Sequence, residues 1–532
     1  MMKEEEEEVV VMIVGAGPAG LATAACLNTL SIPNVVLEKE DCSASLWKKK
    51  SYDRLKLHLA KQFCALPHMP FPDAAPTFVP KGGFIEYLDA YVAQFEIRPV
   101  YCTAVESASF DEGSKRWTVL GRHAVTGGRT EYSARFLVVA TGENGESWIP
   151  DVAGLSTFTG TTMHSLFYKS GEVYAGKSVL VVGSGNSGME IAYDLANDGA
   201  KTAISIRSPF HVMSKEMVQL GMDIMKYFPL CLVDSILLTL ANIQYGDLSR
   251  YGIIRPRMGP LKLKAKTGRS SVIDVGTVKK IKMGEIKVFG GISYIKGNKV
   301  VFQDGKSNEF DDIIFATGYR STANKWLKDG DRLLGKDGMP KGRFPNHWKG
   351  SDGLYCAGLG RRGLAGISMD AKNIAKDIKK IYDTTMQRWR QGSRSWLPWR
   401  ELRICQGRRG GRRGGWRRVN AAKRGEEGRR RWGRGWRHRG KQIQGRRHRG
   451  RRRHRGRRLR QAEKERGRQA EIAAWRQAET VAPQKAKIGR GGEETRQAEK
   501  GSGGGRQRLQ HGSRRSYSTT KSDDRERLDG GR

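Results

Sequence analysis

Cysteine is scarce in this sequence and never closely paired. The 532 residues contain only seven cysteines, and no two of them form a C-x-x-C pair. Scattered cysteines argue against a disulfide scaffold or a zinc site and are typical of a reducing compartment, so we expect no metal site. The seven are Cys26, Cys42, Cys64, Cys102, Cys231, Cys356 and Cys405.

A basic leader and a long apolar run are also missing. The chain starts with the acidic MMKEEEEE, whereas a secretory or organellar leader needs basic residues and an apolar run. The longest apolar stretch, Tyr227 to Ala241, is interrupted by Asp234 and is too short to span a bilayer. We therefore expect a soluble cytoplasmic protein without a membrane span. Association with the surface of the endoplasmic reticulum stays open.

Positive charge is abundant but unevenly distributed. Lysine and arginine number 96 against 55 acidic residues, for a formal net charge of +41. Residues 401–532 hold 43 of the basic residues and 14 of the acidic ones, so most of the net charge lies there. The overall charge therefore does not by itself indicate a nucleic-acid-binding protein.

A glycine-rich turn follows the first apolar run. The pattern predicts a strand over Val9–Val14, a helix over Leu21–Leu30, a strand over Val35–Leu37 and then Glu38. In a dinucleotide-binding unit the glycines permit a tight turn and close approach of a pyrophosphate, and the acid accepts hydrogen bonds from the ribose. The turn consists of Gly15, Ala16, Gly17, Pro18, Ala19 and Gly20.

The same unit recurs later in the chain. Ser178–Val182 is predicted to be a strand, a helix runs through Ala196, and the next strand, Thr202–Ile206, is followed by Arg207. An arginine in place of the acid can hold a ribose 2′-phosphate, which a carboxylate would repel. We therefore expect NADPH here, with an exposed surface arginine as the alternative for Arg207. The second turn consists of Gly183, Ser184, Gly185, Asn186, Ser187 and Gly188.

Two strand-then-ATG segments flank the second unit. Phe136–Ala140 precedes Thr141-Gly142, and Ile313–Ala316 precedes Thr317-Gly318. We expect turns at both places where the chain crosses between domains, which makes the second unit an insertion in the first. The predicted fold is α/β, with two Rossmann-like domains that bind FAD and NADPH. The predicted domains are 8–150 and 319–390 for FAD, 151–318 for NADPH, and a tail of 398–532.

Several further motifs resemble a known family. Phe158-x-Gly160-x-x-x-His164-x-x-x-Tyr168 resembles the fingerprint of class B flavin-containing monooxygenases. Other stretches resemble the plant YUCCA proteins, over about residues 8–385. They include YDRLKLHLAKQF after Ser51, ATGEN from Ala140, YGIIRPRMGPLKLK from Tyr251 and RRGLAG from Arg361. Ser184, Ala60 and Ala19 depart from the cysteine, proline and serine usual in that family.

The resemblance implies an activity. A YUCCA-like enzyme would use NADPH to reduce FAD, form a C4a-(hydro)peroxyflavin with O2, and convert indole-3-pyruvate to indole-3-acetate, the auxin, with loss of CO2. Two other functions stay open: oxygenation of nitrogen or sulfur in another small molecule, and RNA binding by a chain with a degenerate enzyme body. The intact glycines of both turns argue against degeneration.

Candidate site residues follow from their positions in these motifs. His58 is a candidate donor to the peroxide oxygen or a satisfied buried polar group. Lys61, Gln62 and Asn144 are further candidate catalytic residues: Lys61 and Gln62 as contacts to cofactor or substrate carboxylate, Asn144 as a contact to nucleotide or simply a turn asparagine. Trp47 packs against FAD or within the core, and Gly358 is a candidate FAD contact in the returning segment. His164 is expected to serve packing. Arg361 and Arg362 are candidate contacts to the substrate carboxylate or an FAD phosphate, with exposed surface arginines as the alternative.

The tail changes composition abruptly after about Leu397. Its Arg/Gly tracts have no apolar periodicity, so we expect a disordered tail without a packed core. Such tracts, with Trp416, Trp432 and Trp436, can bind RNA non-specifically through charge and stacking. A nuclear-localising segment and a read-through or incorrect gene model are the alternatives, and the abrupt onset favours the last.

Overall fold

A computed structural model describes residues 6–390 of the chain. The tail predicted for residues 398–532, together with its RNA contacts, lies outside the described residues.

The first sheet is built around β1 (Glu6–Val14), whose central residues are fully buried. Its strand order is β2-β1-β5-β4-β3, and β18 also pairs with β5. β1 pairs in parallel with β2 and β5, and β18 pairs in parallel with β5, whereas β3 and β4 form an antiparallel extension. Val11, Met12 and Ile13 are each 0% exposed, as expected for an apolar interior strand of a covered parallel sheet. The other strands are β2 (Asn34–Leu37), β3 (Thr103–Asp111), β4 (Arg116–His123), β5 (Arg129–Val139) and β18 (Leu354–Cys356).

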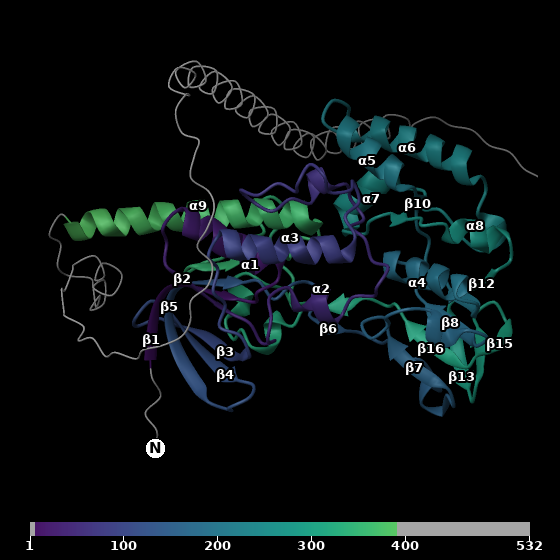
Figure 1. Cartoon of the computed structure of the whole chain (residues 1–532), viewed down its shortest axis with the longest axis horizontal. Helices are drawn as coiled ribbons and strands as arrows, with labels where there is room; N and C mark the ends of the chain where they lie inside the picture. The colour runs from purple at the N-terminus through teal and green to yellow at the C-terminus, as the bar shows by residue number, and fades with distance from the viewer. Residues whose placement is uncertain (1–5, 391–532) are drawn as a thin grey trace, which may run out of the picture. The chain divides into compact units, whose positions relative to one another are not determined.

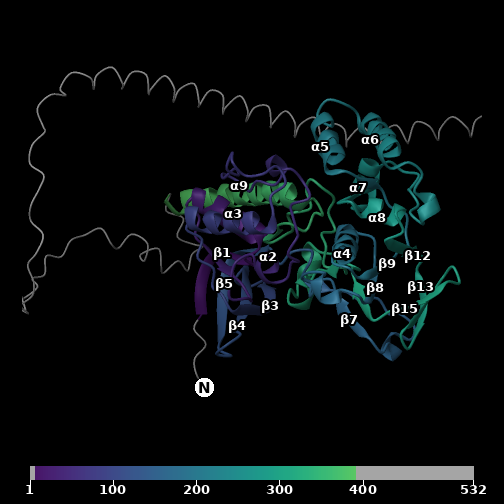
Figure 2. The ribbon, with the colours of Figure 1, turned by 45° about the vertical axis from the view of Figure 1, so that its right-hand side comes forward.

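Three long helices cover one face of this sheet. They are α1 (Pro18–Thr29), α3 (Lys81–Gln94) and α9 (Gly363–Arg390), and α1 contacts both of the others. Figures 1 and 2 both show them on the same side of β1 and β5. Buried Leu27, Phe84 and Ile374, one from each helix, belong to a single apolar core. The short helix α2 (Ser45–Lys49) contacts α3.

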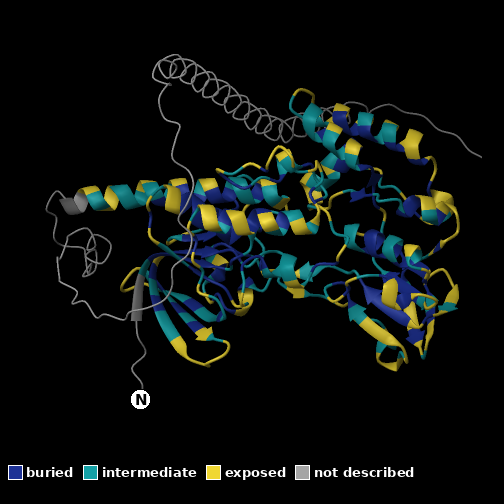
Figure 3. Ribbon diagram, viewed as in Figure 1, coloured by how far each residue is buried: buried dark blue, intermediate teal, exposed yellow. Residues whose placement is uncertain are grey.

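The second sheet is entirely parallel, with the order β12-β9-β8-β16-β7. Its central strands β8 and β16 are buried, as the dark blue colour in Figure 3 shows. The helices α4 (Asn186–Asn197) and α8 (Thr277–Lys282) pack beside it. The strands are β7 (Thr161–His164), β8 (Ser178–Val182), β9 (Lys201–Ser205), β12 (Ile286–Phe289) and β16 (Asp312–Phe315).

Smaller elements surround the second sheet. An antiparallel sheet contains β13 (Ile292–Lys296), β14 (Lys299–Phe302) and β15 (Ser307–Glu309). The two short strands β10 (Val212–Met213) and β11 (Val272–Ile273) pair in parallel. The segment between them carries α6, which contacts both α5 and α7. These helices are α5 (Lys215–Ile224), α6 (Leu230–Tyr245) and α7 (Pro260–Thr267).

The chain crosses between the two sheets twice, and the crossings pair with each other. β6 (Glu146–Ser147) and β17 (Tyr319–Arg320) form a short antiparallel ladder, with Tyr319 opposite Ser147. The predicted turns after the two ATG segments therefore lie side by side. The second sheet is formed by residues between β5 and β18 of the first, which makes it an insertion.

Both predicted strand–turn–helix units and the α/β fold are confirmed. The RRGLAG segment of the sequence leads directly into the long helix α9, which begins at Gly363. The proposed domain boundaries stay predictions.

Trp117 anchors the antiparallel extension. It is 0% exposed, and its indole Nε1–H donates to the Asp352 carbonyl at 2.9 Å. Trp117→Ala is expected to destabilise the protein by about 3–5 kcal/mol through the cavity left behind. Thermal and denaturant unfolding followed by circular dichroism measure this. Val125→Ala, at an 80% exposed position, is the control and should change stability by less than about 0.5 kcal/mol; equal stability of the two variants would contradict the expectation.

Candidate functional site

The first glycine turn joins β1 to α1 and leaves room for a phosphate group. Gly15 has φ +108°, and a Cβ there would lie 2.6 Å from the carbonyl oxygen of Ala140. A Cβ on Gly20 would lie 1.8 Å from the Gly15 oxygen, whereas a Cβ on Gly17 would meet no atom within 4 Å. The first and third glycines are therefore required by close contacts. The second leaves open space at the helix N-terminus, where this fold binds a pyrophosphate.

The start of α1 is suited to an anion. Gly17 is the N-cap residue, Pro18 is the first helical residue, and no side chain caps the helix. The N–H groups of the first turn have no intrahelical acceptors, and the helix dipole places partial positive charge there. The turn thus fits the pyrophosphate of FAD.

Glu38 lies against this turn, just after β2. Its carboxylate is buried and accepts hydrogen bonds from the backbone N–H groups of Ala16 at 2.7 Å and Glu40 at 3.1 Å. These bonds hold the acid beside the turn. Its contact with a ribose stays a prediction.

The second glycine turn repeats the geometry of the first. Gly183 has φ +112°, and a Cβ there would lie 2.6 Å from the Ala316 carbonyl oxygen. A Cβ on Gly188 would lie 1.9 Å from the Gly183 oxygen, and one on Gly185 would meet nothing within 4 Å. Ser184 and Ser187 are half-buried in this turn. The second turn therefore has the same space for a dinucleotide pyrophosphate.

The two ATG segments have a role that the sequence did not reveal. Ala140 and Ala316 are the residues whose carbonyl oxygens approach Gly15 and Gly183. Each ATG segment thus begins where a strand ends beside a glycine turn, and the carbonyl group of its alanine packs against the first glycine of that turn.

Arg207 lies two residues beyond β9. It is exposed, and no hydrogen bond or ion pair of its side chain is found within residues 6–390. An unpaired guanidinium at the end of the second strand of this unit is free to bind a 2′-phosphate, and its exposure equally fits the alternative of a surface charge.

Gly358 and Trp47 both lie near the first turn. A Cβ on Gly358, which has φ +77°, would lie 2.9 Å from the Cβ of Ala19. Trp47 belongs to α2, whose N-cap residue, Ala44, donates its N–H to the carbonyl of Ala16 at 2.9 Å. The Trp47 ring packs edge-on against Phe84 with centroids 4.6 Å apart. Core packing is thus observed for Trp47, and its contact with FAD stays a prediction.

His58 is held by the helix that follows the second glycine turn. Its Nε2 lies 2.9 Å from Glu190 Oε1, and its Nδ1 lies 3.3 Å from the side-chain amide nitrogen of Asn186. The amide oxygen of Asn186 accepts the Ile273 N–H at 2.8 Å, so its nitrogen must face His58. A neutral His58 is therefore the Nε2–H tautomer, donating to Glu190.

Residues that the sequence did not single out complete this contact. Glu190 is 3% exposed, and its other oxygen accepts the Tyr52 hydroxyl at 2.9 Å. Nearby, Arg54 pairs with Asp194 at 3.3 Å. Glu190 stands four residues after Asn186, on the same face of α4, and this spacing is the signal that could have indicated the pair.

Lys61, Gln62 and Asn144 occupy different surroundings. The Lys61 ammonium donates to the carbonyls of Pro72 at 3.1 Å, Asp73 at 2.9 Å and Ala75 at 2.5 Å. All three of its N–H donors are thereby used to hold a loop. Gln62 and Asn144 are exposed. The described contacts bring neither of them to His58, and their catalytic roles stay predictions.

His164, at the end of β7, contacts the backbone of the second crossing segment at Gly318. Its Nδ1 accepts the Leu166 N–H at 3.1 Å, and its Nε2 lies 3.0 Å from the Gly318 carbonyl oxygen, so Nε2 carries the proton. Burial lowers the pKa of His164, and the hydrogen bond to Gly318 acts in the opposite direction.

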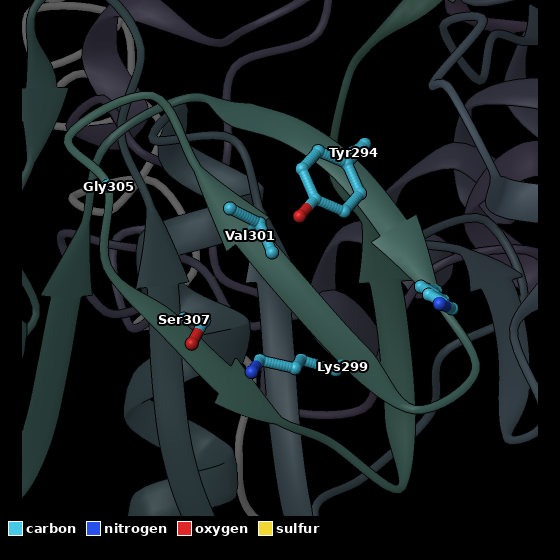
Figure 4. A pocket seen from close by; sticks show the side chains of 6 residues that line it. Tyr294, Lys299, Val301, Gly305 and Ser307 are labelled. Carbon is cyan, nitrogen blue, oxygen red and sulfur yellow. The ribbon is translucent and has the colours of Figure 1, made fainter. Parts of the chain in front are cut away.

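One surface hollow lies away from the glycine turns. It has a volume of about 460 Å³ and lies on the small antiparallel sheet β13–β15, where Tyr294, Lys299 and Val301 line it (Figure 4). None of its lining residues belongs to either glycine turn, so the hollow is no part of the candidate site.

The fold and the two turns define a class of protein. Two dinucleotide-binding units, one inserted in the other and joined through His58 and α4, are the architecture of a flavoprotein that also binds a nicotinamide dinucleotide. Two solved structures have a similar fold. A flavin-containing monooxygenase from Stenotrophomonas maltophilia is 19% identical with a TM-score of 0.53, covering 71% of this chain and 99% of that chain. An ε-caprolactone-bound cyclohexanone monooxygenase is 17% identical with a TM-score of 0.54, covering 72% and 89%.

Curated relatives are much more similar in sequence. The probable indole-3-pyruvate monooxygenase YUCCA10 of Arabidopsis thaliana is 56% identical over 375 residues, which are 70% of this chain and 98% of that protein. The indole-3-pyruvate monooxygenases YUCCA6 of Arabidopsis thaliana and YUCCA1 of Oryza sativa subsp. japonica are 48% and 46% identical. They cover 70% and 74% of this chain and 90% and 95% of their own lengths.

The family model described as flavin-binding monooxygenase-like matches residues 8–332. The chain belongs to this family and, within it, to the YUCCA group. Membership implies FAD as the cofactor, and NADPH is the reductant typical of the family.

No helix within the described residues 6–390 combines the length and the apolar character that crossing a bilayer requires.

Substitutions at the third and the second glycine of the first turn are expected to have different effects. Gly20→Ala should prevent the turn from forming, because its Cβ would collide with the Gly15 carbonyl, and should abolish FAD retention with a loss of folding yield. Gly17→Ala should fold normally but retain less FAD, since only the space for the pyrophosphate is filled. Flavin absorbance per protein and circular dichroism measure both. Full FAD content in folded Gly17→Ala would contradict a pyrophosphate at this turn.

Proposed function

We propose that this enzyme converts indole-3-pyruvate to indole-3-acetate, consuming NADPH and O2 and releasing CO2, water and NADP⁺. The observation that carries the proposal is the similarity to indole-3-pyruvate monooxygenases over nearly their whole length, combined with two intact glycine turns. Bound FAD, once reduced by NADPH, supplies the oxygen activation, so no side-chain nucleophile is needed.

The chain's own residues would bind and orient the two nucleotides. The Gly17 turn would hold the FAD pyrophosphate, with Glu38 on the adenosine ribose and Gly358 beside the start of α1. The Gly185 turn would hold the NADPH pyrophosphate, with Arg207 on the 2′-phosphate. The open space at both middle glycines supports this assignment.

His58 would act as a proton donor on the flavin side. Its Nε2–H is directed at Glu190, so a proton given up on the flavin side would be the one that His58 shares with this carboxylate. Because Asn186 and Glu190 both belong to α4, the nucleotide-binding helix would set the orientation of His58. Glu190 is a positioning residue in this account.

We place the enzyme in the cytoplasm, with the surface of the endoplasmic reticulum as the finer proposal. Cell fractionation of the full chain distinguishes the two.

The direct test uses the purified full chain. We expect a yellow protein with bound FAD that oxidises NADPH faster when indole-3-pyruvate is added and forms indole-3-acetate in equal amount. Failure to hold flavin would end the enzyme proposal. NADPH consumption without the acid product would remove the substrate assignment and favour N- or S-oxygenation of another molecule.

Arg207→Asp tests the 2′-phosphate contact. Loss of a charge-assisted contact and its replacement by repulsion should lower the preference for NADPH over NADH by about 10- to 100-fold. The ratio of kcat/KM for the two nucleotides measures it. Lys201→Asp, an exposed position at the other end of β9, is the control for added negative charge. An unchanged ratio in Arg207→Asp would refute the assignment.

Glu190→Gln tests whether His58 is positioned by a charge. The amide keeps the shape and an acceptor for the His58 N–H but removes the negative charge. We expect folded enzyme in which a smaller fraction of consumed NADPH yields indole-3-acetate, with a matching rise in hydrogen peroxide. Tyr52→Phe, which removes a hydrogen bond to Glu190 without touching His58, is the control. Equal effects of both variants would indicate a purely structural role.

A further inference from the structure

The loop between β18 and α9, residues 357–362, packs against the first glycine turn. The Ala357 N–H donates to the carbonyl of Val139 at 3.0 Å, which sets the start of the loop beside the end of β5. Gly358 follows with φ +77°, and a Cβ there would lie 2.9 Å from the Cβ of Ala19 in the turn. The loop thus lies at the edge of the sheet where this fold binds its nucleotide.

A buried carboxylate of α9 holds this loop. Asp370 is 1% exposed, and its Oδ2 accepts the Gly358 N–H at 3.0 Å. Backbone N–H groups in covered positions are almost always paired, so this bond fixes the position of Gly358. A displaced Gly358 would also change its contact with Ala19 at the start of α1, where the N–H groups expected to bind the pyrophosphate lie.

His347 joins the carboxylate from a third segment. It is 3% exposed, and its Nε2 lies 3.2 Å from Oδ1 of Asp370, close but not aligned as a hydrogen bond. A Cβ on Gly360 would lie 2.5 Å from the same Nε2, so the imidazole also contacts the loop directly. The two side chains therefore contact the loop at two of its glycines, Gly358 and Gly360.

Burial makes the two side chains depend on each other. No hydrogen-bond donor to Oδ1 of Asp370 is found within residues 6–390, and His347 is its ion-pair partner. A buried carboxylate is costly unless a partner compensates its charge, and removing one member of such a pair leaves the other uncompensated. Loss of His347 should therefore disturb Asp370, and through it the loop.

A second carboxylate of α9 offers a comparison. Asp377 comes seven residues, about two turns, after Asp370. It accepts the Tyr355 hydroxyl at 2.7 Å and pairs with Lys349 at 2.8 Å. These contacts join α9 to β18 and to the segment before β18, and not to the loop. The helix thus carries one carboxylate bonded to the loop and one whose contacts serve packing alone.

We propose that Asp370 and His347 are positioning residues for FAD, which hold residues 357–362 against the first glycine turn and thereby set how tightly FAD binds. Neither side chain touches the cofactor in this proposal; both act through the loop. The inference rests on FAD as the cofactor and not on the assignment of the substrate.

Asp370→Leu in the full-length holoenzyme tests the proposal. It removes the acceptor of the Gly358 N–H and should raise the Kd for FAD by about 10- to 100-fold. Flavin fluorescence on release of FAD measures this Kd, and circular dichroism measures folding. Asp370→Asn keeps an acceptor oxygen and should restore most of the affinity.

Asp377→Leu is the matched control. It removes a hydrogen bond and an ion pair from the same helix, so it should lower the unfolding temperature and leave the Kd for FAD unchanged. An equal rise of this Kd in Asp370→Leu and Asp377→Leu would indicate a purely structural role and overturn the proposal, as would an unchanged Kd in Asp370→Leu.

His347→Leu tests the pair even where Asp370→Leu does not fold. It should raise the Kd for FAD in the otherwise unmodified chain, because the carboxylate is left uncompensated, and by a smaller factor in the Asp370→Asn background, where that charge is gone. Equal factors in the two backgrounds would refute the pair. If the unmodified enzyme binds FAD but forms no indole-3-acetate, the proposed function fails and the positioning role stands.

Discussion

The close approach of a glycine turn to the neighbouring parallel strand is the constraint on which the rest depends. In both dinucleotide-binding units the first glycine of the turn has a positive φ. A Cβ on that glycine would lie too close to the carbonyl oxygen of an alanine in the neighbouring strand, so no side chain fits there. The third glycine meets the first equally closely, which lets the helix pack onto its strand. With both contacts made, the second glycine is left facing open space at a helix N-terminus. The cofactor sites are thus a consequence of backbone packing.

The two dinucleotide-binding units are connected by the two crossing segments and also by contacts between side chains. The crossings pair as β6 and β17, and α4 contributes Asn186 and Glu190 to the two ring nitrogens of His58. The helix α4 therefore follows the second glycine turn and also orients His58, which belongs to the first unit. A nucleotide bound at the second turn would therefore contact the same helix that orients His58.

Exposure separates the roles of the basic residues better than their number does. Arg207 is exposed and has no ion pair or side-chain hydrogen bond among the described residues, as suits a phosphate that arrives from solvent with its nucleotide. Lys61 uses its ammonium on three backbone carbonyls and so serves the loop. The formal net charge of +41 distinguishes none of these cases.

The sequence by itself determined the two dinucleotide units, because the glycines, strands and helix of each unit lie within about 30 consecutive residues and their spacing is imposed by local geometry. It also located Glu38, Arg207 and the crossings. Only the tertiary structure joined His58 to Glu190, 132 residues away, and set Gly268, at the end of α7, against Arg361. Such contacts depend on how separate elements pack, and no local pattern records them. The same packing decided that the Lys61 ammonium holds a loop.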